Sequence, residues 1–89
     1  MQQDKIIDSL VLVDLSGLRF PVIVVYKEPK DYPDGLVARV WEGDGNFPTN
    51  MLIIRETLRE IRKDIKAAGF IARFNRQQGD DPVIEEIWI

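Results

Sequence analysis

Residues 19–27 read Arg-Phe-Pro-Val-Ile-Val-Val-Tyr-Lys, and this run decides the fold of the chain. β-Branched and aromatic residues fill it, which is typical of a β-strand. Successive side chains of a strand point to opposite sides, and here both sides are apolar: Phe20, Val22, Val24 and Tyr26 on one, and Pro21, Ile23 and Val25 on the other. A sheet with one side in water would alternate apolar and polar residues. The run therefore predicts a strand that is covered on both sides.

Segments rich in Gly, Pro and Asp separate this strand from other apolar runs. We expect strands at residues 5–14, 19–27, 36–42, 50–55, 71–75 and 83–89, and a helix at 58–68. Residues 50–55 also fit the first turns of a longer helix, because apolar residues recur from Met51 to Ala68 at spacings of three and four. We prefer a strand followed by a helix, since Thr57-Leu58-Arg59-Glu60 matches a capping box and Gly69 suits a helix end.

The resulting order, β-β-β-β-α-β-β, predicts an α+β fold in which one helix packs on an antiparallel or mixed β-sheet. The chain has 89 residues, too few for a second core, so we expect a single domain over residues 1–89. One short helix covers one side of a sheet. The second apolar side then needs either a strongly curled sheet or another chain, and we expect a homodimer or a small protein partner.

The chain contains no Cys and no His, which removes disulfides and the usual zinc sites. Ser9 and Ser16 lie outside any nucleophile motif, and Gly43-Asp44-Gly45 lacks the Lys and the helix start of a phosphate loop. We therefore expect no enzyme, no cofactor and no metal site. Carboxylates near the C-terminus leave a small carboxylate-based enzyme as a third alternative: Asp80, Asp81, Glu85 and Glu86.

Charge is unevenly distributed along the chain. The formal net charge is −3, with −3 over residues 1–50, +4 over 51–79 and −4 over 80–89. The basic segment supplies the candidate contacts to a partner or to phosphates: Arg55, Arg59, Arg62, Lys63, Lys66, Arg73 and Arg76. These residues either neutralise acidic groups of the same chain or receive an acidic partner. A nucleic-acid-binding module that uses the helix residues of this set is the alternative function.

Three stretches of the chain carry a family resemblance: Phe20 to Tyr26, Asp34-Gly35-Leu36-Val37-Ala38 and Glu56-Thr57-Leu58-Arg59-Glu60-Ile61. Over roughly half to two-thirds of its length, the chain resembles the HicB-type antitoxin domain. The resemblance implies a dimeric, non-enzymatic protein that neutralises a small RNase toxin. The chain departs from the family where Arg55-Glu56 replaces the usual Gly-Asp before the Thr, and the chain is also similar to short bacterial families with no assigned role.

The N-terminal residues carry no basic start followed by an apolar segment, and the apolar runs are far shorter than the ~20 residues of a membrane span. The absence of Cys fits a reducing compartment. We therefore expect a cytoplasmic protein without membrane contact. The leading hypothesis from the sequence is a protein-interaction module that acts through a sheet face or edge.

Overall fold

Strands from the whole length of the chain meet in one sheet, and the computed structural model describes residues 3–89. In chain order the elements are β1 (Lys5–Ile6), a 3-10 turn (Leu10–Leu12), β2 (Pro21–Lys27), β3 (Leu36–Glu42), β4 (Phe47–Arg55), α1 (Leu58–Ala67), β5 (Arg73–Asn75) and β6 (Ile84–Trp88). The α+β fold and the order of strands and helix are confirmed. The segment before the helix is strand, as the capping box at Thr57 predicts.

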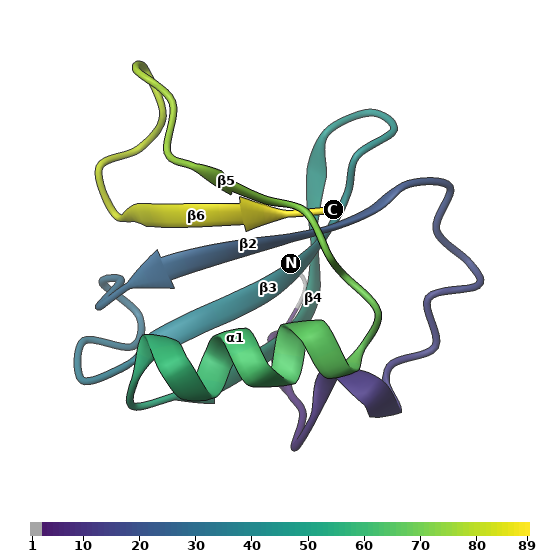
Figure 1. Ribbon diagram of the computed structural model, residues 1–89, viewed down its shortest axis with the longest axis horizontal. Coiled ribbons are helices and arrows are strands. Elements are labelled where there is room, and N and C mark those ends of the chain that lie inside the picture. Colours follow the sequence, from purple (N-terminus) through teal and green to yellow (C-terminus); the bar gives the residue numbers. More distant parts are fainter. Residues whose placement is uncertain (1–2) are drawn as a thin grey trace.

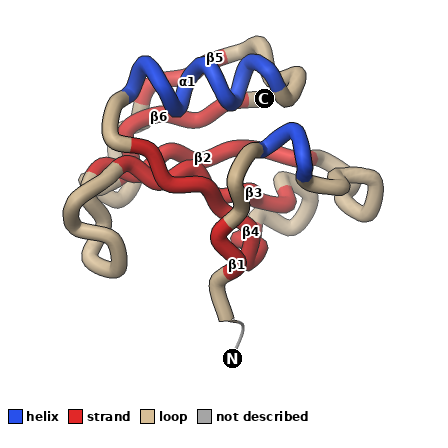
Figure 2. Tube along the Cα trace, turned by 90° about the horizontal axis from the view of Figure 1, so that it is seen from below, coloured by secondary structure: helices blue, strands red, loops and turns tan. Residues whose placement is uncertain are grey.

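The six strands lie in the order β1-β4-β3-β2-β6-β5 (Figure 1). β2 and β3 form the central hairpin, paired without interruption from Pro21↔Glu42 to Lys27↔Leu36. β1 pairs with β4 in parallel and every other neighbouring pair is antiparallel, so the sheet is mixed. Figure 2 shows the strands fanning out from β6 to β1, which reflects the twist of the sheet.

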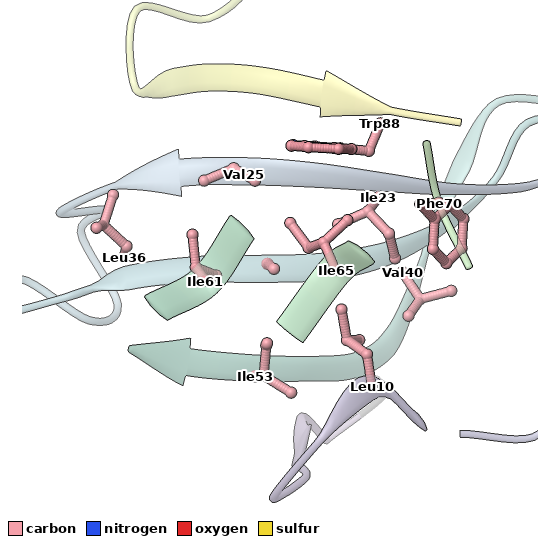
Figure 3. Close-up of a cluster of buried hydrophobic side chains, with 11 residues drawn as sticks. Leu10, Ile23, Val25, Leu36, Val40, Ile53, Ile61, Ile65, Phe70 and Trp88 are labelled. Carbon is pink, nitrogen blue, oxygen red and sulfur yellow. The ribbon is translucent and has the colours of Figure 1, made fainter. Parts of the chain in front are cut away.

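Helix α1 packs on one side of this sheet through its apolar stripe. Thr57 Oγ1 accepts a hydrogen bond from the Glu60 amide at 3.2 Å and donates to the Glu60 carboxylate at 2.9 Å, which fixes the helix start. Gly69 ends it with a φ of 99°, a conformation that glycine adopts without strain. Figure 3 shows that Ile61 and Ile65 of α1 point into the core. The core also contains Leu10, Ile23, Val25, Leu36, Ala38, Val40, Ile53, Phe70 and Trp88.

The first predicted strand, residues 5–14, is wrong beyond Ile6. Ser9 caps the 3-10 turn at Leu10–Leu12, because its side chain accepts from the Val11 amide. Asp64 of α1 then accepts from Ser9 Oγ at 3.1 Å and from the Leu10 amide at 2.9 Å. These bonds fold the segment over the helix side of the sheet, where Leu10 is buried in the core.

Glu42 ties the segment before β2 to the turn after β3. Its buried carboxylate accepts from the backbone amides of Arg19 at 2.8 Å, Phe20 at 2.9 Å and Asp44 at 2.9 Å. Burial raises the pKa of the Glu42 carboxyl, but the three N–H donors together outweigh this effect, so its pKa lies below the ordinary value. The adjacent Gly43 is in close contact with Phe20 of the same segment.

The second side of the sheet carries no helix among the described residues, yet part of it is buried. Val24, Val37 and Leu52 are at most 5% exposed. Val24 pairs with Arg39 and Val37 pairs with Tyr26, so long side chains flank the small ones. The part of this side that stays accessible is therefore smaller than the sequence suggests, and its half-buried residues include aliphatic, aromatic and charged side chains.

Replacing Gly43 with Ala is expected to destabilise the protein. A Cβ atom there would lie 2.9 Å from Phe20 Cδ1, 2.9 Å from the Phe20 carbonyl oxygen and 3.1 Å from Val22 Cγ2. Overpacking against backbone costs about 1–3 kcal/mol of unfolding free energy, measurable by urea denaturation. Gly17→Ala is the matched control, because nothing lies within 4 Å of its Cβ position. An equal effect of the two variants would contradict the contact.

Glu42 is also expected to make stability depend on pH. A carboxyl whose pKa is lower in the folded state stabilises the fold above its ordinary value of 4.5, and this contribution is lost as pH falls through the folded pKa. Glu42→Gln should therefore lose stability at pH 7 and show a flatter decline below pH 4.5 than the unmodified protein. The control Glu56→Gln, at an exposed position, should follow the unmodified protein.

Candidate interaction face

The side of the sheet opposite α1 is called here the open face. It is formed by alternate residues of β2, β3 and β4 together with two residues of β6: Val22, Val24, Tyr26, Val37, Arg39, Trp41, Leu52, Ile54, Ile84 and Ile87. Its parity is fixed by the core, because Ile23, Val25, Ala38 and Val40 occupy the alternate positions under the helix. The central hairpin therefore sets the side on which its own residues lie, and its pairing with β4 and β6 sets the side of theirs.

Trp41 and Tyr26 form a bridge across the open face. Trp41 Nε1 donates a hydrogen bond to the Tyr26 hydroxyl oxygen at 3.0 Å. Trp41 pairs with Val22 and Tyr26 pairs with Val37, so the two side chains meet over Val24, which lies between them. This bridge explains why Val24 is buried without a covering helix.

Burial is the main cause that raises the pKa of Tyr26, and the negative charge of Asp81 raises it further. The hydrogen bond from Trp41 and the positive charge of Arg39 lower this pKa, but they do not outweigh burial. The Tyr26 hydroxyl is therefore neutral at pH 7 and can still donate one hydrogen bond to a partner. Because Trp41 already occupies a lone pair of this hydroxyl, the direction of that remaining donor is restricted.

Arg39 is the charged centre of the open face, and Asp4 holds it in place. Arg39 donates to Asp4 Oδ1 at 2.9 Å, to Asp4 Oδ2 at 3.0 Å and to the Thr49 carbonyl at 3.0 Å. The Tyr32 hydroxyl also donates to Asp4, at 2.9 Å. The hydrogen bond from Arg39 is the main cause that lowers the pKa of Asp4, with burial opposing it and Tyr32 reinforcing it. Bidentate pairing fixes the guanidinium plane as well as its position.

Two hollows flank the Trp41–Tyr26 bridge. The larger, of about 340 Å³, has polar and aromatic walls that include Asp4, Tyr26, Asp31, Tyr32, Arg39 and Asn50. The smaller, of about 200 Å³, is mostly apolar and is lined by Val22, Val24, Trp41, Gly43, Asn46, Asp80, Ile84 and Ile87. Besides the paired Asp4, the first hollow has the carboxylate of Asp31 at its border. The second hollow has the carboxylate of Asp80 at its border. The open face thus combines an apolar half and a polar half with an acidic border.

The basic residues singled out from the sequence lie elsewhere, on α1, at the end of β4, and on or just after β5. Three of them are held in ion pairs: Arg55 with Asp64, Arg62 with Glu86 at 2.7 Å and Arg73 with Glu86 at 3.7 Å. Lys66 Nζ lies 6.0 Å from the centroid of the Trp88 ring, within reach of a cation–π contact. The exposed Arg59, Lys63 and Arg76 have no ion pair within residues 3–89.

Of the four carboxylates singled out near the C-terminus, Asp80, Asp81 and Glu86 have structural partners. Glu86, only 1% exposed, accepts from Arg62 and from Trp88 Nε1 at 2.6 Å, and it lies on the helix side of the sheet. Asp80 accepts from the Gln77 amide and Asp81 from the Val83 amide, which are turn bonds. Over residues 3–89 no group of three or more Asp and Glu side chains could hold a metal ion.

Sequence reasoning missed Asp4, Tyr32, Arg39 and Trp41. A signal was present for Arg39, because it interrupts the apolar run Leu36–Trp41 at a position where the strand is central in the sheet. Its partner Asp4 lies 35 residues away in sequence, and only the parallel pairing of β1 with β4 brings it close. Local patterns carry no information on such a pairing.

Comparisons of the chain with protein-family models, with curated proteins and with solved structures find no match. The resemblance to the HicB-type domain therefore stays a prediction from the three sequence stretches. In the part of the chain that the structure describes, no helix is long and apolar enough to cross a membrane.

Asp4 is expected to hold β1 on the sheet through Arg39. The Ile7 amide, which donates to the Leu52 carbonyl at 2.8 Å just after β1, should exchange with deuterium faster in Asp4→Ala. The Ile23 amide in the central strand should keep its protection. Asp8→Ala removes an exposed carboxylate nearby and serves as the control. Unchanged exchange of Ile7 in Asp4→Ala would show that the cluster does not anchor the segment.

Proposed function

We propose that this chain is a non-enzymatic protein-interaction module that binds a basic protein partner through its open face. The observation that carries the proposal is the grouping of Trp41, Tyr26 and Arg39 on a sheet side that no helix covers within residues 3–89. Trp, Tyr and Arg are the residues most enriched among those that dominate binding energy at protein interfaces.

The side chains of this group are held in place before any partner arrives. Trp41 is bonded to Tyr26, and Arg39 is bonded to Asp4 and Thr49. Ordering a flexible side chain on binding costs about 0.5–1.5 kcal/mol, and side chains that are already fixed avoid most of this cost. The two hollows offer a partner one apolar and one polar recess. This combination supports a protein ligand with an apolar anchor and a polar or charged one.

The charge of the open face favours a basic partner. Arg39 is neutralised by Asp4, whereas Asp31 at the border is exposed and Asp80 stands at the other border. The whole chain has a net charge of −3. Complementary charge accelerates association and excludes partners of the same sign.

We propose an antitoxin-like role, in the cytoplasm, as the biological form of this activity. An RNase must hold a polyanionic substrate, so its binding surface is basic. An acidic surface with aromatic anchors is suited to cover such a site. The sequence stretches that resemble the HicB-type domain support the same role.

The alternative of nucleic-acid binding through α1 has weaker support. Of its four helix residues, Arg62 is already paired with Glu86 and Lys66 lies over Trp88. The third alternative, carboxylate-based catalysis, needs a carboxylate available to a substrate, whereas Asp80 and Glu86 accept hydrogen bonds from within the chain.

Calorimetric titration with the purified product of the adjacent reading frame tests the proposal. Asp31→Asn/Asp80→Asn removes two border charges, while the side-chain carbonyl introduced at position 80 can still accept from the Gln77 amide. We expect binding by the unmodified chain and a weakening of about tenfold in the double variant, greater at low salt. The matched control is Asp8→Asn/Asp14→Asn, which changes the net charge of the chain by the same amount. Its two positions lie on either side of the 3-10 turn.

Absence of binding would overturn the antitoxin-like role. Equal weakening by both double variants would show that net charge alone, and not the open face, attracts the partner. Binding of a short fluorescent RNA at low salt that Arg59→Glu/Lys63→Glu abolishes would favour the nucleic-acid alternative instead.

A further inference from the structure

β5 is an open edge of the sheet with hydrogen-bonding groups directed outward. Ala72 and Ile89 exchange two backbone hydrogen bonds, of 3.0 and 2.9 Å, where β5 begins to pair with β6. Hydrogen-bonded and non-hydrogen-bonded pairs alternate in an antiparallel ladder, so Phe74↔Ile87 is bonded whereas Arg73↔Trp88 and Asn75↔Glu86 are not. The backbone N–H and C=O groups of Arg73 and Asn75 therefore point away from β6.

Large apolar side chains are exposed along the same edge. Phe74 is 48% exposed and Ile71, just before β5, is 87% exposed. Ile89 at the end of β6 is 40% exposed. Figure 1 shows β5 bordering the sheet beside β6, with the C-terminus next to it. An unpaired strand edge that also carries exposed apolar residues is a template for another strand.

We infer that a second copy of this chain pairs with β5, antiparallel and about a two-fold axis at Phe74, to join two sheets into one. The outward groups of Arg73 bond to those of Asn75 in the second copy, and the reverse pair is identical by symmetry. Phe74 then faces Phe74 of the second copy in a non-hydrogen-bonded pair, the arrangement in which side chains are closest.

This register is compatible with the side chains that it places opposite one another. Arg73 meets Asn75 of the second copy, and Ala72 meets Arg76, so no like charges are directly opposed. The two Arg73 side chains lie on a diagonal, and each is already paired with its own Glu86 at 3.7 Å. Aromatic pairs such as Phe74 with Phe74 add to the stability of neighbouring strands.

The chain protects this edge only lightly. The Gln77 side-chain amide donates to the Asn75 carbonyl at 3.1 Å on the surface, a bond that the amide of Arg73 in the second copy would replace. β5 contains no Pro and no bulge that would prevent pairing. The opposite edge is less suited to a second copy, because β1 has only two residues and one of them is Lys5.

The dimer would extend the open face and not cover it. Phe74 has the parity of Ile87, so it lies on the open-face side of the sheet. Two open faces would then form one surface with the Phe74 pair at its centre. This inference is independent of the identity of the partner proposed above, because it uses the sheet edge alone.

Cysteine cross-linking tests the register, since the chain has no Cys of its own. In Phe74→Cys the two new residues face each other across the axis, at a Cα separation that a disulfide accepts. In Asn75→Cys the two lie on a diagonal, about 8 Å apart between Cα atoms, which a disulfide does not span. Under air oxidation we expect a covalent dimer of Phe74→Cys that is at least about tenfold more abundant than that of Asn75→Cys.

Light scattering of the Cys-free chain supplies the second measurement. We expect a mass that rises toward that of a dimer with concentration, and a monomer for Phe74→Asp with unchanged circular dichroism. A monomer at every concentration, or equal cross-linking of the two Cys variants, would overturn the inference. A dimer that Asp31→Asn/Asp80→Asn dissociates but Phe74→Asp does not would place self-association on the open face instead.

Discussion

The structure depends on one constraint: the central hairpin of β2 and β3 is apolar on both sides, and residues 3–89 provide a single α-helix to cover them. Ile23, Val25, Ala38 and Val40 pack under α1, where Ile61 and Ile65 meet them. The residues of the hairpin on the open face have no helix over them within residues 3–89. There, neighbouring side chains shield the apolar surface instead. Trp41 and Tyr26 close over Val24, and Arg39 with Asp4 and Tyr32 forms a polar cluster beside them. The groups that shield the second side are thus the groups that a partner would meet.

Buried carboxylates in this chain act as structural ties. Glu42 collects three backbone amides and fixes the segment before β2 against the following turn. Glu86 joins β6 to α1 through Arg62 and to the core through the Trp88 indole. A buried carboxylate is costly unless its oxygens are fully bonded, and both residues meet that condition.

Much of the fold could be predicted from short-range patterns. The apolar runs at β2 and β3, the capping box at Thr57 and the glycine at position 69 identified two strands and the helix correctly, whereas the pairing of the two strands as the central hairpin came from the structure. The segment after Ile6 was misread because its apolar residues look like a strand, whereas Asp64, 54 residues away from Leu10, draws it into a 3-10 turn. The polar cluster was missed for the same reason, since Asp4 reaches Arg39 only after β1 has paired with β4. The basic residues were visible in the sequence, but their acidic partners were assigned by tertiary structure.

The accessibility of Trp41 in a complex tests the role of the open face most directly. Trp88 is 2% exposed, so acrylamide quenching of tryptophan fluorescence reports mainly on Trp41, and Trp88→Phe makes the assignment unambiguous. When a protein partner binds, quenching of Trp41 should fall nearly to the level of a buried tryptophan. A stable complex in which Trp41 is quenched as readily as in the free chain would show that the open face is not where this protein meets its partner.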